Sequence, residues 1–97
     1  MFPLMRFKIR DKSMEPSFGE GDYVVANKLA YLFRKPKIGD VVVAKHDGSF
    51  IIKRITKTKG GRYFVCGDNG KYSSRLWIGR KNIVGRVWFH LKKSAKR

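Results

Sequence analysis

Two residues that together can cleave an amide bond stand out in this chain: Ser13, in the segment Ser13-Met14-Glu15-Pro16, and Lys53. Ser13 directly follows an expected strand and opens a loop that Pro16 restricts, so its hydroxyl and backbone N–H are expected to point out of the sheet. Such a hydroxyl becomes a nucleophile when a neighbouring base takes its proton. By local sequence alone, an ordinary turn serine is the commoner interpretation.

Lys53 lies in the apolar stretch Phe50–Thr56. Strand alternation places Lys53 on the same face as Ile51 and Ile55 and places Arg54 on the opposite face, so one of the two basic side chains must lie among apolar neighbours. A buried lysine loses the hydration of its charged form, its pKa falls, and the neutral amine can take a proton from serine, which arginine cannot do. Alternatively, the lysine stem covers the sheet while the ammonium reaches water.

Other reactive residues fit less well. His46 and His90 could be drawn into a Ser-His-Asp triad, but they lie at a hairpin end and near a strand end, where ordinary histidines are common. Cys66 is expected to pack as a small hydrophobic residue. Two histidines and one cysteine without close spacing predict no metal site, and we expect no cofactor.

Short strands are expected to position these residues. Period-two apolar alternation, abundant Val, Ile, Phe and Tyr, and regularly spaced glycines predict an all-β fold with at most one short helix. Residues Lys28–Lys35 have the only helix-like spacing, and Pro36 ends it, which predicts a short helix or an ordered loop. Strands are predicted at Arg6–Arg10, Asp22–Asn27, Asp40–His46, Ser49–Lys57, Arg62–Cys66 and Ile83–Leu91.

Glycine-containing turns separate the predicted strands. Asp47-Gly48 and Gly60-Gly61 favour the positive φ values of two-residue hairpin turns. Residues Gly67–Gly70 are expected to form a turn and Lys71–Gly79 a loop. The pattern therefore predicts two consecutive hairpins followed by an irregular connection to the last strand.

Size and charge restrict the possibilities further. With 97 residues and 42% apolar side chains, the chain is expected to form a single domain, residues 1–97. The formal net charge of +16 suits an anionic partner, either nucleic acid or an anionic membrane surface. The apolar run Met1–Met5 is far shorter than the ~20 residues that span a bilayer, so we expect no transmembrane segment and a cytoplasmic or peripheral membrane location.

Five short segments resemble, in order, the sequence boxes of the signal peptidase I family, whose catalytic core is shared by the self-cleaving SOS-response repressors. The resemblance covers nearly the whole chain. The segments are Ser13-Met14-Glu15-Pro16-Ser17, Gly39-Asp40-Val41-Val42-Val43, Ile52-Lys53-Arg54-Ile55, Gly67-Asp68-Asn69 followed by Ser74-Arg75, and Gly85-Arg86-Val87.

This resemblance implies a small core of twisted antiparallel sheets and a serine endopeptidase with a Ser/Lys dyad. The expected substrate is a protein or peptide that is cleaved after a small residue, with loss of an N-terminal signal or propeptide. The implied roles are nucleophile for Ser13, general base for Lys53, orientation of Lys53 for Ser74, substrate contact for Met14 and Pro16, and shaping of the site for Gly67, Asp68, Asn69 and Arg75.

Two positions depart from the family pattern. Asp11 stands two residues before Ser13, where relatives often carry a hydroxyl that helps to hold the oxyanion. Because a carboxylate would repel an oxyanion, we expect Asp11 to point away and the Ser13 N–H to be the main donor. The run Tyr72-Ser73-Ser74-Arg75 also lacks the aspartate that precedes Ser-Arg in the family.

Two alternative functions remain open from the sequence. One is a basic β-barrel that stacks nucleic-acid bases on aromatic side chains, and the other is a catalytically inactive, peptide-binding relative of the peptidases. The nucleic-acid alternative explains neither a lysine on an apolar strand face nor the ordered boxes. Its candidate stacking residues are Tyr23, Tyr31, Phe50, Tyr63, Phe64, Tyr72 and Trp77.

Overall fold

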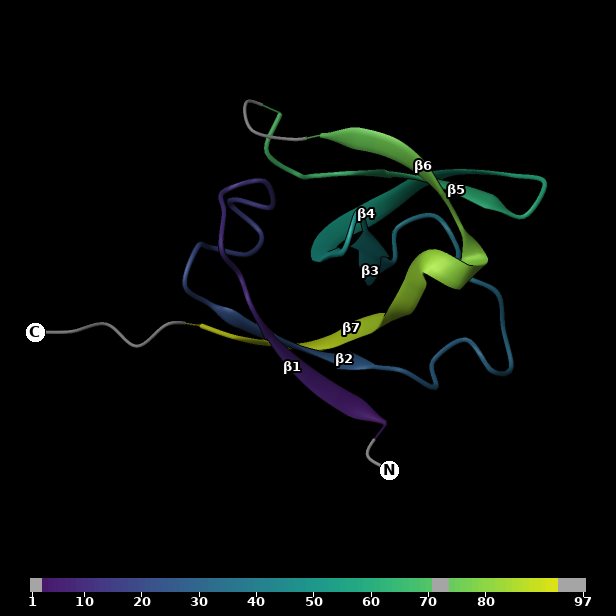
Figure 1. The fold of residues 1–97 in the computed structure, drawn as a ribbon. Coiled ribbons are helices and arrows are strands. Elements are labelled where there is room, and N and C mark those ends of the chain that lie inside the picture. The colour runs from purple at the N-terminus through teal and green to yellow at the C-terminus, as the bar shows by residue number, and fades with distance from the viewer. Residues whose placement is uncertain (1–2, 71–73, 93–97) are drawn as a thin grey trace, which may run out of the picture.

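The computed structural model describes residues 3–70 and 74–92, which form one seven-stranded antiparallel sheet (Figure 1). The all-β prediction is confirmed. The spatial order of the strands is β1-β2-β7-β3-β4-β5-β6. The strands are β1 (Leu4–Lys8), β2 (Tyr23–Asn27), β3 (Val41–His46), β4 (Ser49–Lys59), β5 (Arg62–Cys66), β6 (Arg75–Gly79) and β7 (Ile83–Leu91), and a 3-10 turn, η1 (Arg80–Asn82), precedes β7.

The sheet is bent, so that β1, β2 and β7 lie on one side of the molecule and β5 and β6 on the other (Figure 1). Pairing shifts at Val25/Ala26 against β7, at Val43/Ala44 against β7, and between Ile55 and Lys57 against β5. Each shift is a bulge, which increases the local twist and bends the strand that carries it. These bulges allow segments that are distant in the sequence to face one another.

The buried hydrophobic cluster is formed by residues of the strands β3 to β7 and of the loop after β2. A glycine is required where β7 passes the end of β2, because a Cβ at Gly85 would lie 2.7 Å from the Asn27 carbonyl oxygen. The core cluster consists of Tyr31, Val42, Ala44, Ile55, Tyr63, Val65, Ile78 and Ile83.

The two predicted hairpin turns are confirmed. Asp47 and Gly48 have φ values of 51° and 79°, and Gly60 and Gly61 have values of 55° and 81°. Positive φ at both central residues matches the right-handed twist of the flanking strands. The β3–β4 and β4–β5 hairpins therefore have the connections that the sequence predicts.

Residues 28–35 form an ordered loop of turns and bends, which is one of the two structures expected there. The Ala30 N–H donates to the Asn27 carbonyl and the Leu32 N–H to the Leu29 carbonyl, so single turns form without a continuous helix. Within residues 3–70 and 74–92, no helix is long and apolar enough to cross a membrane.

The prediction of a loop over residues 71–79 is wrong for its second half. Residues Arg75–Gly79 form β6, which pairs with β5, while residues 71–73 lie outside the described part of the chain. Ile78 faces the core with 2% exposure and Trp77 faces outward with 39% exposure. A strand of five residues with only two inward side chains has too short an alternation to stand out from the polar segment before it.

Candidate active site

The nucleophile candidate Ser13 lies in a compact loop between β1 and β2. The Glu15 N–H donates to the Lys12 carbonyl at 3.1 Å, and the Phe18 N–H donates to the Met14 carbonyl at 2.9 Å. These consecutive turns bury Ser13 to 5% exposure and Met14 to 1%. The serine is therefore held inside the loop rather than displayed on the surface.

A second segment, the turn at residues 67–69, holds this loop from the side. The Asn69 N–H donates to the Ser13 carbonyl at 2.8 Å, and the Asn69 side-chain amide donates to the Lys12 carbonyl at 2.9 Å. The Asp68 N–H contacts the Met14 sulfur at 3.4 Å. Three contacts from two adjacent residues thus tie the turn after β5 to the segment that carries Ser13.

Lys53 lies in β4 between Ile51 and Ile55, on the face that alternation predicts. Its partner in the neighbouring strand β3 is the fully buried Val42. Lys53 is only 4% exposed. It is therefore buried among apolar neighbours and does not extend its ammonium into water. Burial removes water from the ammonium and lowers the pKa of Lys53, while electrostatic interactions with Asp11 and Cys66 raise the pKa in opposition. The amine is shifted toward its neutral form.

Arg54, the next residue in β4, points to the other face and forms a bidentate pair with Asp68. Its Nε and Nη2 donate to Oδ1 and Oδ2 of Asp68, each at 2.9 Å, and its Nη1 donates to the Gly39 carbonyl at 3.0 Å. The hydrogen bonds from Arg54 hold the pKa of Asp68 below its usual range against the effect of burial. Arg54 therefore joins the strand of Lys53 to the turn that supports Ser13.

The sequence motifs did not predict the Arg54–Asp68 pair. The signal for it was the Lys53-Arg54 dipeptide, because a lysine directed into the core forces the adjacent arginine onto the opposite face. A half-buried arginine needs a carboxylate of matching geometry there, and Asp68 belongs to one of the recognised boxes.

Ser13 and Lys53 line the same cleft, which has a volume of about 570 Å³. One wall is β1 together with the residues that follow it, and the other is the first half of β4. The rings of Phe7 and Phe50, 5.2 Å apart, join the two walls. The lining residues are Arg6, Phe7, Lys8, Ile9, Arg10, Asp11, Ser13, Met14, Ser49, Phe50, Ile51, Ile52, Lys53 and Ser74.

The cleft brings together Ser13, Lys53, Met14 and Ser74 of the predicted site. Pro16 is exposed and does not line the cleft. Gly67, Asp68 and Asn69 also lie outside the lining, and of these Asp68 and Asn69 contact the Ser13 loop. Arg75 is exposed at the start of β6, opposite Cys66.

Asp11 does not point away from Ser13, and the expectation that it would is wrong. Its Oδ1 accepts hydrogen bonds from the Ser13 N–H at 3.1 Å and from the Ser13 hydroxyl at 2.9 Å. An aspartate readily forms such a turn with the N–H two residues later, which explains why the carboxylate faces the loop. The expected oxyanion donor is therefore already engaged.

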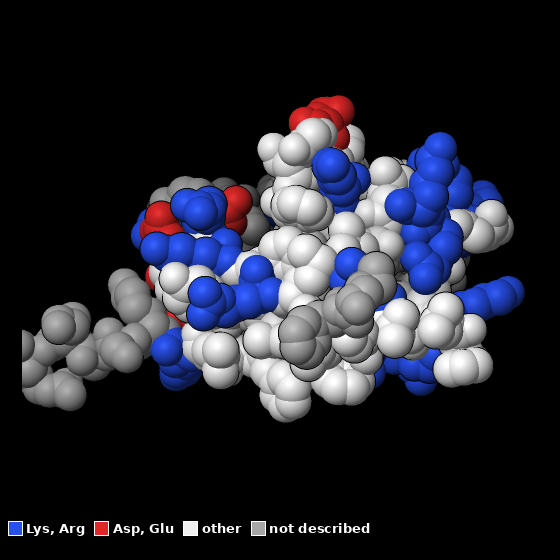
Figure 2. All heavy atoms as spheres, turned by 60° about the horizontal axis from the view of Figure 1, so that its bottom comes forward, with Lys and Arg blue, Asp and Glu red and all other residues white. Residues whose placement is uncertain are grey.

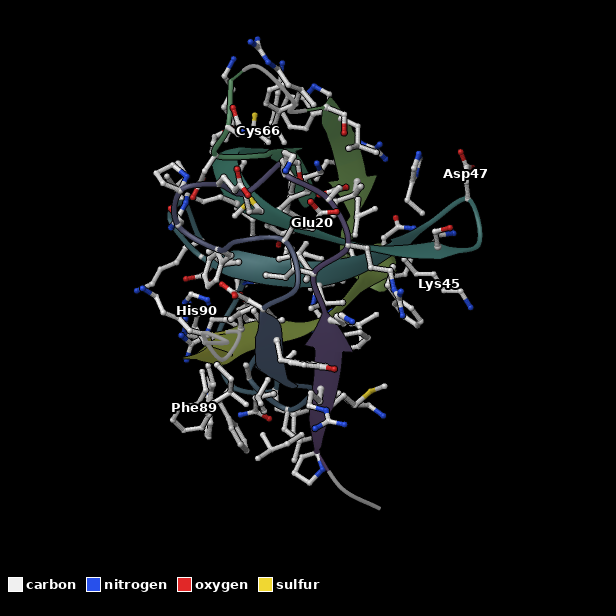
Figure 3. All side chains as sticks on the ribbon, turned by 90° about the vertical axis from the view of Figure 1, so that its left-hand side faces the viewer. Glu20, Lys45, Asp47, Cys66, Phe89 and His90 are labelled. Carbon is white, nitrogen blue, oxygen red and sulfur yellow. The ribbon has the colours of Figure 1, made fainter. Side chains whose placement is uncertain are left out.

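The two histidines lie away from the cleft and from each other. His90 Nε2 lies 2.7 Å from Asp22 Oδ2, and the His90 ring meets Phe18 edge-on. His46 Nε2 lies 3.4 Å from Asp47 on the β3–β4 hairpin. Figure 3 shows His90 and Asp47 at opposite sides of the molecule. Neither histidine contributes to a triad with Ser13.

The aromatic side chains suggested for base stacking do not form one platform. Tyr31 and Tyr63 are buried in the core, with 7% and 5% exposure. Phe64 and Trp77 form a tilted pair on β5 and β6, whereas Phe50 lines the cleft. Tyr72 lies outside the described residues.

Among residues 3–70 and 74–92, no group of three or more His, Cys, Asp or Glu residues could hold a metal ion.

Two curated relatives are similar to parts of the chain. It is 35% identical over 68 residues to the probable thylakoidal processing peptidase 2 of Arabidopsis thaliana chloroplasts, in an alignment covering 60% of this chain and 18% of the relative. It is 46% identical over 37 residues to thylakoidal processing peptidase 1 of the same organism, covering 38% of this chain and 11% of the relative. The chain thus spans less than a fifth of the length of these relatives.

The family model described as Peptidase S24-like matches residues 3–88, from the residue before β1 into β7. The match includes both segments that meet at the cleft. With the similarity to the processing peptidases, it confirms the expected relationship to peptidases of the signal peptidase I and S24 type. The chain belongs to the Peptidase S24-like family.

Proposed function

We propose that this chain is a serine endopeptidase in which Ser13 attacks the scissile carbonyl and Lys53 acts as its general base. The observation that carries the proposal is that both side chains, at 5% and 4% exposure, line one cleft although they come from distant segments. Neither histidine of the chain lines this cleft. Lys53 is therefore the basic group in the cleft best suited to serve the serine.

The environment of Lys53 suits a base. Its lowered pKa increases the fraction of neutral amine near physiological pH, and a neutral amine can take the hydroxyl proton as Ser13 attacks. The resulting ammonium then protonates the leaving amine, which completes the acyl-enzyme. Ser74, which also lines the cleft, would orient the amine by hydrogen bonding.

The oxyanion requires a rearrangement of Asp11. In the resting arrangement the Ser13 N–H donates to Asp11, so a substrate carbonyl must displace the carboxylate before it can accept this bond. The positive charge that develops on Lys53 offers the displaced carboxylate a favourable new neighbour. Asp11 thus separates a closed resting site from an open reacting one.

Strand addition is the expected mode of substrate binding. The Ser49–Lys53 half of β4 pairs with β3, whereas the pairing of β4 with β5 begins at Arg54. In the described sheet, β1 is an edge strand paired only with β2. Two unpaired backbone edges therefore flank the cleft, and an extended peptide can hydrogen-bond with either of them.

Met14 supports a preference for small side chains before the scissile bond. It lines the cleft at 1% exposure, so its thioether fills space that a larger substrate side chain would need. The removal of a signal or propeptide after a small residue fits this restriction. It also fits the two similar proteins of Arabidopsis thaliana, which are named processing peptidases.

The decisive experiment is mass-spectrometric detection of cleavage in a peptide pool that contains small-x-small sequences. Wild type is compared with Ser13→Ala and Lys53→Ala, and with Thr58→Ala and Lys81→Ala as controls at exposed positions outside the cleft lining. We expect cleavage after small residues by wild type and both controls, and none by the two site variants. Cleavage that survives Ser13→Ala contradicts the proposal.

The two alternative functions have distinct outcomes in the same preparation. An inactive relative binds the peptides without cleaving them under any condition. A nucleic-acid-binding protein retains nucleic-acid affinity in Ser13→Ala, and that affinity falls steeply as salt rises.

A further inference from the structure

A second cavity, of about 580 Å³, lies at a different part of the molecule from the Ser13 cleft. It is formed by the loop between β2 and β3, the β4–β5 hairpin and η1, and it shares no lining residue with the cleft. The lining residues are Tyr31, Leu32, Phe33, Arg34, Lys35, Pro36, Thr58, Lys59, Gly60, Gly61, Tyr63 and Arg80. The peptidase proposal assigns no role to any of them.

The cavity is cationic. Its charged lining residues are Arg34, Lys35, Lys59 and Arg80, and no Asp or Glu lines it. Arg34 pairs with Asp40 at 3.3 Å, whereas Lys35 and Lys59 have no acidic partner within the described ranges. Such a concentration of one sign of charge attracts anions.

Figure 2 shows how these charges lie on the surface. Lys and Arg gather at the right of this view, the side on which Figure 1 draws η1 and the loop between β2 and β3. No acidic residue lies beside that group in the view, whereas acidic side chains accompany the basic group at the left. In this view, the side of the molecule that carries η1 and the loop between β2 and β3 is therefore positively charged.

Apolar side chains project from the same loop. Leu29, Leu32, Phe33 and Ile38 are 47%, 64%, 97% and 61% exposed. Four large exposed apolar residues within ten positions exceed the single exposed residues that a soluble surface normally shows. Aliphatic side chains gain nothing from a phosphodiester backbone, but they are favoured at the boundary between lipid headgroups and acyl chains.

We propose that the loop segment 29–38 and the adjoining cationic cavity bind the surface of a bilayer that contains anionic phospholipid. Leu32 and Phe33 enter the acyl boundary, and Lys35 and Lys59 contact lipid phosphate. Three of the four exposed apolar residues, Leu29, Leu32 and Ile38, are aliphatic and offer no ring on which a base could stack, so their combination with the lysines favours a membrane over nucleic acid. This inference is independent of peptidase activity.

Flotation of the full chain with lipid vesicles tests the proposal. We expect binding to vesicles of phosphatidylcholine mixed with phosphatidylglycerol, and much weaker binding to phosphatidylcholine alone. Lys35→Ala and Lys59→Ala each lower the affinity about fivefold, the effect of one basic residue near an anionic surface. Leu32→Ser with Phe33→Ser lowers it roughly tenfold or more, because the apolar contacts are lost.

Matched controls distinguish this surface from general charge and from catalysis. Phe89→Ser removes a phenylalanine of β7 that is 54% exposed, Lys92→Ala removes a distant cation, and Ser13→Ala removes the proposed nucleophile; all three should bind as wild type does. Equal loss with Phe89→Ser or Lys92→Ala overturns the proposal. So does retention of binding by the Leu32/Phe33 variant, or lysine-dependent binding to single-stranded DNA with no binding to the mixed vesicles.

Discussion

Asp11 Oδ1 lies 2.9 Å from the hydroxyl oxygen of Ser13 and also accepts the Ser13 N–H at 3.1 Å. One carboxylate oxygen therefore accepts hydrogen bonds both from the hydroxyl of the proposed nucleophile and from the backbone N–H that an oxyanion would use. Negative charge at this position opposes the charge that develops during acyl transfer. The same charge raises the pKa of Lys53, in opposition to burial.

Replacement of Asp11 by serine is expected to accelerate peptide cleavage. The change frees the Ser13 N–H and introduces a hydroxyl donor, so kcat/KM should rise about tenfold, below the effect measured when a whole oxyanion donor is lost. Steady-state kinetics on a cleaved peptide measure this, with Asp47→Ser on the exposed hairpin as a control that should change nothing. A large loss of activity would instead identify Asp11 as an essential participant.

The pH profile should report the titration of Lys53. Its pKa is lowered by burial, and the neutral amine is the active form, so kcat/KM should rise with pH and level off below the ordinary lysine value of about 10.4. Because the Asp11 charge raises this pKa, Asp11→Ser should move the rising limb to lower pH. An unchanged limb in that variant would mean that another group controls the profile.

Lys53→Met should stabilise the fold at neutral pH while abolishing cleavage. Folding lowers the pKa of Lys53, so at pH values below this folded pKa the folded protein carries the cost of a buried charge. Above the unfolded pKa of about 10.4, Lys53 is neutral in both the folded and the unfolded protein, and the cost disappears. The stability of wild type relative to Lys53→Met should therefore rise between the two pKa values. Urea unfolding of both proteins across this range measures it, and a difference independent of pH would contradict a charged buried lysine.

Loss of the Arg54–Asp68 pair should weaken both stability and catalysis. Asp68→Asn removes the charge from a bidentate contact whose side chains are 34% and 17% exposed, so we expect a loss of about 1–2 kcal/mol after solvent screening. The depressed pKa of Asp68 makes this contribution present above about pH 4 and lost as pH falls through the folded value.

Denaturant unfolding and cleavage assays measure the effect of Asp68→Asn. Glu20→Gln, which breaks the exposed Lys12–Glu20 pair, serves as the control and should cost no more than about 0.5 kcal/mol. Equal effects of the two changes would show that the Arg54–Asp68 pair has no special role.

Gly85→Ala should destabilise the sheet. Its Cβ would lie 2.7 Å from the Asn27 carbonyl oxygen, a backbone atom that moves only if β2 shifts, so we expect a loss of about 1–3 kcal/mol. Gly79→Ala is the matched control, because its Cβ would meet the Asn82 side chain at an ordinary 3.6 Å. Thermal or urea unfolding compares the two, and equal stability of both variants would refute the close approach.

Local features of the fold follow from short-range sequence patterns. The hairpins at Asp47-Gly48 and Gly60-Gly61 could be predicted because both positions need positive φ. Residues 75–79 could not be predicted as a strand, since β6 is short and its pairing with β5 supplies the backbone partners that its own sequence does not signal. The Lys53 side of β4 was predictable, because alternation is a property of the strand itself.

By itself, the sequence determined the all-β class, the hairpin turns and the family relationship, because each depends on residue types and their spacing along the chain. It placed Lys53 on the face of Ile51 and Ile55 but left open whether Lys53 or Arg54 faces the core, which the structure decided. Only the tertiary structure decided what these residues contact: Ser13 with Lys53 in one cleft, Arg54 with Asp68, and Asp11 on Ser13. The physical reason is that long-range contacts depend on sheet order and bulges, which arise from the packing of distant strands. Electrostatic repulsion predicts that Asp11 avoids a reacting oxyanion, but the resting loop contains no such charge, and its local hydrogen bonds place the carboxylate on the serine.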